Sequence, residues 1–473
     1  YVGELYFQAH RGTYTSQART KRGNRKCEFA LREVEFWGTA ARIINNFIYP
    51  YDEMDELWKM VLFNQFHDVI AGSSIQRVHE EAEADYQHVL KRAHSIINSA
   101  VSSIIRNSEE IEEITVFNSL PWDRTELVLL PANTQSARSF SGDNLPVQII
   151  EDMAFTEVKV PSCGWTTLKI TEDADKNPVL PGANVTLPVV KAAQRLLENE
   201  YLRIEFNEKG EITSIYDKEA SRELTAGLCN SFKMYKDVTT HYDAWDIDSM
   251  YEKLPVELNG KASVKVLYEG LLAAGIRIER MLNNSLMKQE VTLRRGSRRV
   301  DFKTTVDWRE SHKLLKVAFP VNIHTNEGVH EIQFGHIRRP NHKSRQYDAD
   351  RFEVCNHKWT AIMEENRGFA VLNDCKYGVN VSGGSINLTL LKSPLAPDMY
   401  ADKGLQEFTY AFYTWNGSFA ESGVVREAYE LNCPVFTARG RAGEKSLFRV
   451  DVPGVIIETV KPAEDRSNDI IIR

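Results

Sequence analysis

The spacing of hydrophobic residues predicts a helical first part of the chain. From about residue 24 to residue 106, apolar side chains recur every three or four positions, as they do along one face of a helix. Three such faces follow one another, and helices of this kind pack as a bundle or against a neighbouring domain. The residues that define the three faces are Phe29, Leu31, Val34, Trp37, Ala41 and Ile44; Met54, Leu57, Trp58, Val61 and Leu62; and Ile75, Val78, Ala82, Val89, Ala93, Ile96, Ala100 and Ile104.

After about residue 112 the pattern changes to the alternation of half-buried strands. Leu202, Ile204 and Phe206 alternate with polar residues, and so do the apolar positions of 300–308. Similar short runs, separated by Gly and Pro, continue to the end, with almost no return of the helical period. We therefore expect an α+β chain in which a three-helix bundle segment precedes large antiparallel β-sandwich domains.

Length and composition refine this outline. At about 150 residues per domain, 473 residues predict about three domains, which we place at 1–110, 111–190 and 191–473. The net charge of −8 argues against a nucleic-acid partner, and we interpret the basic run 19–26 as a solvated helix start. No apolar run is long enough to cross a membrane. Six scattered cysteines without a CxxC pair predict free thiols and a cytoplasmic location.

The pair His67-Asp68 is the first candidate for chemistry. Phe63, Phe66 and Val69 surround it in sequence, so we expect the imidazole and the carboxylate to be half-buried at the edge of a core. A neutral imidazole would bind a divalent metal, with the carboxylate on the metal or on a substrate hydroxyl. The alternative is a histidine at a helix end that backbone carbonyls satisfy. Spacing alone favours this alternative, since no second ligand lies nearby.

The residues that follow this pair allow two smaller predictions. Ser73 and Gln76 match a capping box, which would start the third helix. His79 and His88 lie nine positions apart on that helix and cannot share a face at ligand spacing. We expect both imidazoles to be solvated.

A second candidate is the segment 241–248, which contains one histidine and three acids. His241 and Asp243 would share a face if the segment were extended, as would Asp246 and Asp248. A metal site is the least favoured of three interpretations. The others are a sugar-binding rim, with aspartates on vicinal hydroxyls and Trp245 on a sugar ring, and an exposed loop.

Two further segments combine basic, aromatic and hydroxyl side chains. Segment 6–26, which contains His10-Arg11-Gly12-Thr13-Tyr14-Thr15, suits either recognition of a polyol or a loop that satisfies its own backbone. Segment His336–His342 would line a cleft or decorate a β-loop. The sequence holds no Gly-rich phosphate loop, GxSxG or HExxH motif, and spacing assigns no pair of catalytic carboxylates.

Taken together, the ordered motifs of the whole chain resemble glycoside hydrolase family 38, and in particular its cytosolic-type α-mannosidases. The segments that carry the resemblance are Gly3-Glu4-Leu5-Tyr6 and residues 10–15, Asn24-Arg25-Lys26, residues 64–69 (NQFHDV), residues 117–122 (FNSLPW), Asp243-Ala244-Trp245-Asp246, residues 331–336 (EIQFGH), residues 372–378 (LNDCKYG) and Glu407-Phe408-Thr409-Tyr410.

The resemblance implies an enzyme with an N-terminal α/β catalytic domain, a three-helix middle domain and C-terminal β-sandwiches, of which this chain would contain the last two. It implies a divalent metal, zinc or alternatively cobalt, with His67 as one ligand. Asp68 would hold substrate hydroxyls, and Asp243 and Asp246 would face the substrate. The nucleophile, the acid/base carboxylate and an HxD ligand pair would precede Tyr1, and we reject His241-Tyr-Asp243 as that pair.

The implied activity is hydrolysis of terminal α-D-mannosides of oligosaccharides or glycoconjugates with retention of configuration. We expect the chain alone to be inactive and to hold zinc weakly, because one ligand cannot close a four-coordinate site. The expected partners are the α-mannoside, the chain's own N-terminal catalytic domain and further copies of the same protein. The alternatives are a carbohydrate-binding or scaffold module, a mannosylglycerate-type hydrolase and an inactive relative.

Overall fold

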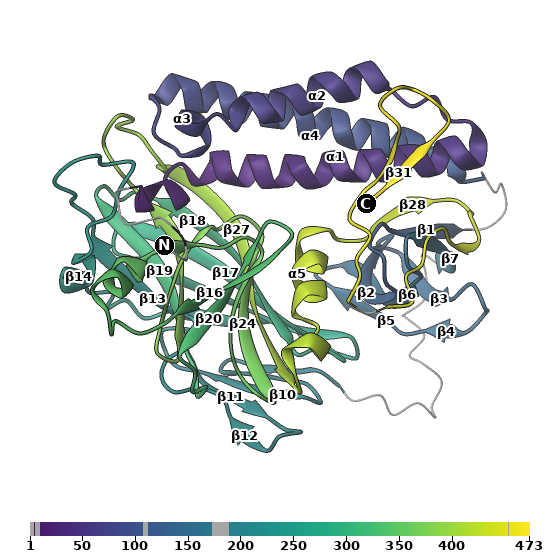
Figure 1. Cartoon of the computed structure of the whole chain (residues 1–473). Coiled ribbons are helices and arrows are strands. Elements are labelled where there is room, and N and C mark those ends of the chain that lie inside the picture. The colour runs from purple at the N-terminus through teal and green to yellow at the C-terminus, as the bar shows by residue number, and fades with distance from the viewer. Residues whose placement is uncertain (1–3, 5–9, 107–111, 173–188, 453) are drawn as a thin grey trace.

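The computed structural model describes residues 4, 10–106, 112–172, 189–452 and 454–473. In this part of the chain a layer of long helices lies across β-sheets that form a larger and a smaller body (Figure 1). This confirms the predicted fold class, an α+β chain that begins with a helical bundle and continues with antiparallel β-sandwiches. The α-helices are α1 (Ala18–Asn45), α2 (Tyr51–Asn64), α3 (His67–Ile70), α4 (Gln76–Ile104) and α5 (Val424–Asn432).

The predicted apolar faces of α1, α2 and α4 form the core of the helical layer. Leu31, Val34 and Trp37 of α1 are fully buried, as are Val61 of α2 and Val89 of α4. Burying a side chain of this size contributes about 1.5–3 kcal/mol. The same core includes Phe117 and Trp165 of the smaller β body, so the helices and this body share one hydrophobic core.

The start of the third helix differs from the prediction. Helix α4 begins at Gln76 after Ile75, and no side chain caps it. The hydroxyls of Ser73 and Ser74 donate instead to the carbonyl oxygen of Asp68, at 3.4 and 2.8 Å. The predicted capping box is therefore wrong, because α3 uses these hydroxyls to close its own turn.

The prediction of solvated basic groups is also wrong at three positions. His79 is only 2% exposed, and its Nδ1 lies 3.3 Å from the hydroxyl of Thr20 on α1. His88 is exposed, as expected. In the basic run, Lys21 and Arg25 are 5% and 2% exposed. The side chains of Lys21 and Arg25 lie on the face of α1 that packs onto other elements. The number of charges in the sequence does not show which face of the helix is buried.

The smaller β body is a sandwich of two sheets. One sheet has the strand order β28-β1-β7-β3-β4 with β29 beside β7, and the other has the order β2-β6-β5. The strands are β1 (Glu113–Asn118), β2 (Arg124–Leu130), β3 (Thr134–Arg138), β4 (Asn144–Leu145), β5 (Val147–Ile150), β6 (Met153–Val160), β7 (Gly164–Glu172), β28 (Phe436–Arg439) and β29 (Glu444–Ser446). The domain boundaries at 110 and 190 stay a prediction. Strands β28 and β29, which follow residue 190, pair with β1 and β7, which precede it.

The larger β body contains three sheets around one core. Their strand orders are β12-β11-β10-β9-β8, β14-β13-β19-β26-β25-β22 and β15-β16-β17-β18-β27-β24-β23-β20-β21. The five-stranded sheet has β8 (Lys191–Ala193), β9 (Leu196–Glu198), β10 (Leu202–Phe206), β11 (Ile212–Asp217) and β12 (Arg222–Glu223). The six-stranded sheet has β13 (Ser231–Lys236), β14 (Pro255–Val256), β19 (Lys313–Pro320), β22 (Val354–Cys355), β25 (Gly378–Ser382) and β26 (Ser385–Lys392).

The nine-stranded sheet has β15 (Ser263–Tyr268), β16 (Ala273–Leu282), β17 (Ser285–Arg294), β18 (Arg299–Trp308), β20 (Glu327–Ile332), β21 (Gly335–Pro340), β23 (Trp359–Glu364), β24 (Arg367–Asn373) and β27 (Gly404–Asn416). Its central pairs β17–β18 and β18–β27 are antiparallel, with Phe302 opposite Val291 and Tyr410. The alternating positions of β18 are buried on one face and accessible on the other, as the sequence predicts.

The C-terminal part contains one helix that was not predicted. Helix α5 packs Val424 and Ala428 against Ala370 and Trp415 of the nine-stranded sheet. Beyond it, the hairpin β30 (Val460–Pro462) and β31 (Ile470–Ile472) lies along α1 (Figure 1). Among the described residues, no helix is both long and apolar enough to span a membrane.

Candidate functional site

The His67-Asp68 pair lies on the short helix α3, which other segments fix at several points. The ammonium of Lys21 on α1 donates to the carbonyl oxygen of Ile70 at 2.9 Å and also to that of Ser16. Gly72 has a φ of +80°, and a Cβ there would lie 2.3 Å from the carbonyl oxygen of Ser16. This close approach requires glycine. The buried side of the turn is therefore firmly positioned.

The other side of this turn faces outward. The side chains of His67 and Asp68 are 79% and 50% exposed, with Nε2 and Oδ2 3.6 Å apart. The expectation of a half-buried position is wrong for His67, because Phe63 and Phe66 do not cover the imidazole and are themselves 75% and 55% exposed, whereas Asp68 is half-buried as expected. The ring of Phe66 lies 4.3 Å from the imidazole, centre to centre.

This exposed imidazole suits a metal ligand that needs further donors. Zinc sites in proteins take three or four protein ligands. Among the described residues, no group of three or more His, Cys, Asp or Glu side chains could hold a metal ion. His67 and Asp68 are adjacent and accessible, so they fit one side of a metal or sugar site whose other donors are not among these residues.

Asp243 lies in a loop rather than in a strand, and its carboxylate is largely engaged. Its Oδ2 accepts from the backbone N–H groups of Leu395 and Ala396, at 2.7 and 3.2 Å, and lies 2.9 Å from Nε2 of His312. Its Oδ1 is buried and has no partner within the described chain. These contacts tie the 241–248 loop to residues 395–396.

Asp246 and its neighbours contact the segment Arg11–Ser16. The Arg11 N–H lies 3.4 Å from Oδ1 of Asp246, and the Gly12 N–H donates to the carbonyl oxygen of Trp245 at 2.8 Å. A Cβ at Gly12 would lie 2.8 Å from the carbonyl oxygen of Asp246. The glycine is therefore needed for the close packing of two segments that are more than 200 residues apart.

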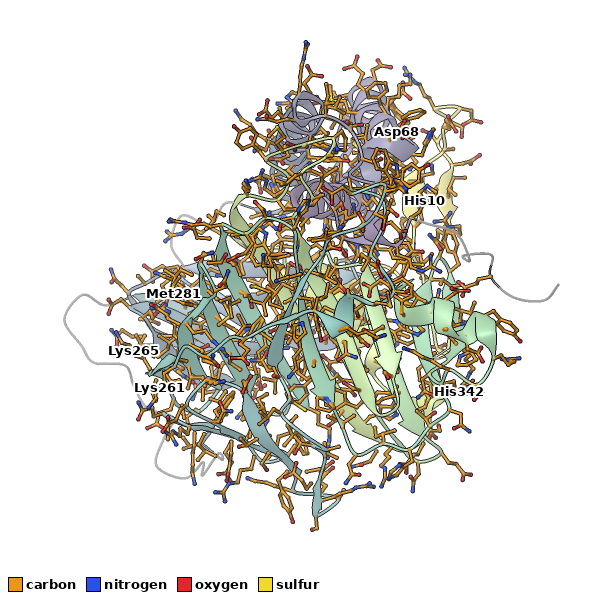
Figure 2. The ribbon with its side chains drawn as sticks, turned by 90° about the vertical axis from the view of Figure 1, so that its left-hand side faces the viewer. His10, Asp68, Lys261, Lys265, Met281 and His342 are labelled. Atoms are coloured by element: carbon orange, nitrogen blue, oxygen red, sulfur yellow. The ribbon has the colours of Figure 1, made fainter. Side chains whose placement is uncertain are left out.

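Three of the four predicted segments meet on one side of the molecule. Ser16 donates from its hydroxyl to the carbonyl oxygen of Ala244 at 2.6 Å and also contacts Gly72 beyond α3. Figure 2 shows Asp68 and His10 on the same edge, one above the other. Residues 1–3 and 5–9, which include Tyr6, lie outside the described residues.

The side chains of the fourth segment, His336–His342, mainly contact other parts of the fold. The guanidinium of Arg339 binds both carboxylate oxygens of Glu4 at 2.6 Å and the carbonyl oxygen of Cys355 at 2.8 Å. His336 packs its ring against Phe419. His342 lies on the same edge as His10 in Figure 2, but further from Asp68.

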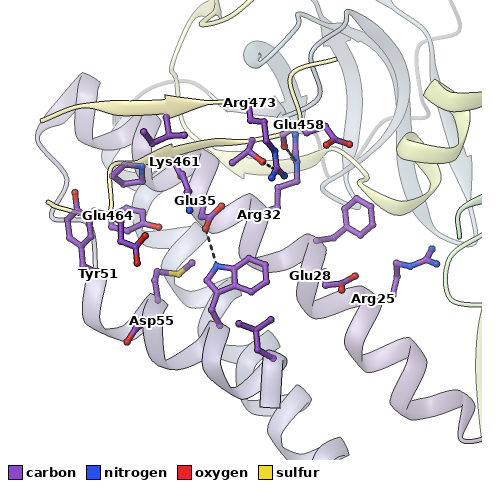
Figure 3. Close-up of a pocket in the computed structure, with 18 of the residues that line it drawn as sticks. Arg25, Glu28, Arg32, Glu35, Tyr51, Asp55, Glu458, Lys461, Glu464 and Arg473 are labelled. Carbon is purple, nitrogen blue, oxygen red and sulfur yellow. Dashed lines mark hydrogen bonds between the residues drawn. The ribbon is translucent and has the colours of Figure 1, made fainter. Parts of the chain in front are cut away.

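A feature that the sequence did not predict is a cavity of about 720 Å³ beside the helical layer (Figure 3). One wall is the face of α1 that carries Arg25, Glu28, Arg32 and Glu35, which recur at helical spacing. The opposite wall includes Glu458 and Arg473. The spacing on α1 was visible in the sequence, but nothing indicated that the last residues of the chain would lie against it.

Two family models match this sequence. The model of the "alpha mannosidase middle domain" matches residues 8–104. The model of the "glycosyl hydrolases family 38 C-terminal domain" matches residues 197–400. These ranges coincide with the helical layer and with most of the larger β body.

Curated relatives extend over nearly the whole chain. Alpha-mannosidase 2C1 of Homo sapiens is 35% identical over 98% of this chain and 44% of its own length. An alpha-mannosidase of Saccharomyces cerevisiae is 32% identical over 98% of this chain and 40% of its own length. The chain thus spans less than half the length of these relatives.

Solved structures show the same fold. The crystal structure of an alpha-mannosidase from Enterococcus faecalis covers 98% of this chain with a TM-score of 0.80 and 16% sequence identity. This chain covers 62% of that structure. The arrangement of helices and sheets is therefore that of a known architecture.

Proposed function

This chain belongs to glycoside hydrolase family 38, whose middle and C-terminal domains it contains, and we propose that it is the C-terminal part of a longer α-mannosidase. The proposed activity is hydrolysis of terminal α-D-mannosides of oligosaccharides or glycoconjugates with retention of configuration. Two observations support the proposal. The relatives are named α-mannosidases, and the chain covers only 44% of the length of the human protein.

The observation that carries the proposal is the position of His67. Its imidazole is 79% exposed on a turn that Lys21 anchors from behind, so a lone pair can point outward at a fixed position. The ring of Phe66 lies beside the imidazole, at 4.3 Å between ring centres. A zinc-type ion held there would bind sugar hydroxyls and favour distortion of the ring towards the oxocarbenium-like state.

The remaining residues would bind and orient the sugar. Asp68 would accept a hydrogen bond from a sugar hydroxyl beside His67, since its carboxylate is half exposed. Asp246 would face the same side from the neighbouring loop. Asp243 is proposed as a positioning residue, because its contacts hold that loop to residues 395–396 and to His312. Its direct binding to substrate stays a prediction.

Retention requires two carboxylates about 5–5.5 Å apart, one as nucleophile and one as acid and then base. We assign neither to this chain and propose that both belong to an N-terminal catalytic domain. Support comes from the surface around His67, where Leu62, Phe63, Phe66 and Ile75 are 58%, 75%, 55% and 57% exposed. Such a cluster is typical of a surface that another domain covers.

The test compares two proteins on a chromogenic aryl α-mannoside. The proposal expects turnover from the longer protein that carries this chain and none from the 473-residue chain alone. Turnover by the chain alone, at a rate that scales with its concentration, contradicts the proposal. A preparation of the chain that carries His67→Ala serves as the control. Turnover by a contaminating enzyme would be the same in this preparation as in that of the unchanged chain.

A second candidate is a carbohydrate-binding module without catalytic partners. The observation in its favour is the Asp243–Asp246 loop, which places Trp245 beside Tyr242 at 6.3 Å between ring centres. Glycan titration of the chain separates this candidate from a scaffold that only completes a catalytic cleft. A mannosylglycerate-type substrate, a cytoplasmic location and self-association also stay predictions.

A further inference from the structure

The cavity beside the helical layer is a site that the proposed hydrolysis does not use. Its lining does not include His67, Asp68, Asp243 or Asp246. It lies between α1, α2, the segment 458–473 and the loop at His357-Lys358. Its volume of about 720 Å³ is within the range of small-molecule sites, roughly 300–1,000 Å³.

The cavity is elongated along α1. Arg25, Glu28, Arg32 and Glu35 lie on the helix face that borders it, and a helix rises about 1.5 Å per residue, so this face extends for roughly 15 Å. Figure 3 shows Arg25 and Glu28 at one end, and Asp55, Tyr51 and Glu464 at the other. A ligand that fills this length is a short chain of units rather than one small ring.

The chemistry of the lining fits a neutral ligand with many hydroxyls. Acidic and basic side chains alternate along the walls in equal number, so the cavity selects neither an anion nor a cation. Aromatic side chains lie between them and offer apolar surface to the faces of sugar rings. The acids are Glu28, Glu35, Asp55, Glu458 and Glu464; the bases are Arg25, Arg32, Lys358, Lys461 and Arg473; the aromatic residues are Phe29, Tyr49, Tyr51, Trp58 and Tyr429.

Several of these groups have hydrogen-bonding capacity left. The guanidinium of Arg25 is 2% exposed and binds two neutral groups, the hydroxyl of Tyr377 at 2.9 Å and Oδ1 of Asn432 at 3.3 Å. Its Nη2 is buried without a partner among the described residues. An unsatisfied buried donor is costly, and a ligand oxygen would remove that cost.

The carboxylates on the same wall are also incompletely paired. Glu28 accepts from Nε2 of Gln65 at 2.9 Å, and Glu35 accepts from the indole N–H of Trp58 at 3.0 Å. Neither makes an ion pair within the described chain, and burial raises the pKa of both carboxyl groups. Each retains an oxygen that can accept from a hydroxyl group.

We propose that this cavity is a second carbohydrate-binding site, which holds a short neutral oligosaccharide between α1 and the C-terminal hairpin. The site does not depend on His67 or on hydrolysis. Only the choice of a mannose oligosaccharide as the probe rests on the proposed function. Glu28 and Glu35 accept sugar hydroxyls, Arg25 and Lys461 donate to them, and the aromatic side chains contact the ring faces.

The test is isothermal titration of the chain with mannotriose. We expect saturable binding by the unchanged chain, at least tenfold weaker binding by Glu28→Gln and Glu35→Gln, and weaker binding by Lys461→Gln. The two Glu→Gln substitutions preserve shape, and thermal unfolding verifies that each variant is folded. Glu81→Gln is the matched control, because Glu81 is exposed on α4, bound to Arg77 and outside the cavity.

A further variant distinguishes this site from the proposed catalytic one. His67→Ala should bind mannotriose with unchanged affinity. If His67→Ala loses binding while Glu28→Gln retains it, the sugar binds at the α3 turn and the second site is wrong, although the proposed function stands. The inference is also overturned if the chain does not bind mannotriose, or if inorganic phosphate binds in the cavity in place of the sugar.

Discussion

Nζ of Lys21 donates a 2.9 Å hydrogen bond to the carbonyl oxygen of Ile70, three residues after His67. The same ammonium binds the carbonyl oxygen of Ser16, so one buried cation joins α1, α3 and the segment that contacts the 241–248 loop. Burial lowers the pKa of Lys21 to about 7 despite the nearby carboxylate of Asp402. The turn that carries His67 and Asp68 thus depends on a buried group that is not itself a candidate ligand.

Replacing this cation should loosen the turn. Lys21→Met removes the donor from two carbonyl oxygens, and unpaired buried groups cost about 1–3 kcal/mol each. We expect the free energy of unfolding to fall by roughly 2–6 kcal/mol in denaturant titrations, because two groups lose their donor. Lys91→Met, at an exposed position of α4, should change it by less than about 0.5 kcal/mol. Equal stability of the two variants contradicts the anchoring role.

The contacts of Asp243 make it a structural carboxylate. Asp243→Ala removes the acceptor of two backbone N–H groups and of His312, so we expect a loss of about 2–3 kcal/mol, measured by urea unfolding. Asp246→Ala should cost less, because Asp246 accepts one long hydrogen bond of 3.4 Å. The reverse order would show that the 395–396 contact does not hold the loop.

A buried ion pair lies beneath the same loop. Lys392 and Asp237 bind each other with fully buried side chains. Removal of one partner leaves an uncompensated charge, so Asp237→Leu should destabilise the chain by about 3–5 kcal/mol. The double variant Asp237→Leu/Lys392→Met should recover most of this loss. A double variant as unstable as the single one would mean that packing, not charge, governs this position.

The buried His79 predicts a loss of stability in mild acid. Burial lowers its pKa from 6.5 to about 4, and the positive charge of Lys21 adds to this effect. Between these two values the unfolded state binds more protons than the folded state, so stability falls as pH drops from 6.5 to about 4. At about 1.4 kcal/mol per pKa unit, His79 contributes up to about 3 kcal/mol of this loss.

Unfolding of the chain and of His79→Gln at pH 7.0 and pH 4.5 measures this contribution. The variant should lose less stability than the unchanged chain between the two pH values. His88→Gln, at an exposed site on the same helix, serves as the control. An equal loss in all three proteins assigns the acid sensitivity to other groups. The first to examine is the half-buried His357, whose pKa is lowered to about 3 by desolvation.

The fold followed from periodicity because its main elements bury one face each. The alternation in 300–308 and 202–206 predicted β18 and β10, and the apolar faces predicted α1, α2 and α4. Helix α5 was missed because it is only nine residues long, and Val424 and Ala428 are its buried apolar side chains. The pairing of β28 with β1 joins residues more than 300 positions apart, which local patterns do not specify.

The sequence predicted which residues form the candidate site, but not how exposed their side chains are. The motif located His67 and Asp68, yet apolar neighbours such as Phe63 and Phe66 suggested a covered position. Hydrophobicity indicates that a face is covered without showing whether this chain or another domain covers it. For the same reason the face Arg25–Glu35 did not reveal the cavity, whose second wall comes from residues 458–473.

The most direct test of the account is the zinc content of the longer protein that carries this chain. We expect close to one metal equivalent in the unchanged protein and in His88→Ala, and a loss of at least tenfold in metal affinity in His67→Ala, as removal of a ligand implies. Hydrolysis of an aryl α-mannoside should fall together with the metal content. If His67→Ala retains its metal and its activity, the assignment of His67 is wrong.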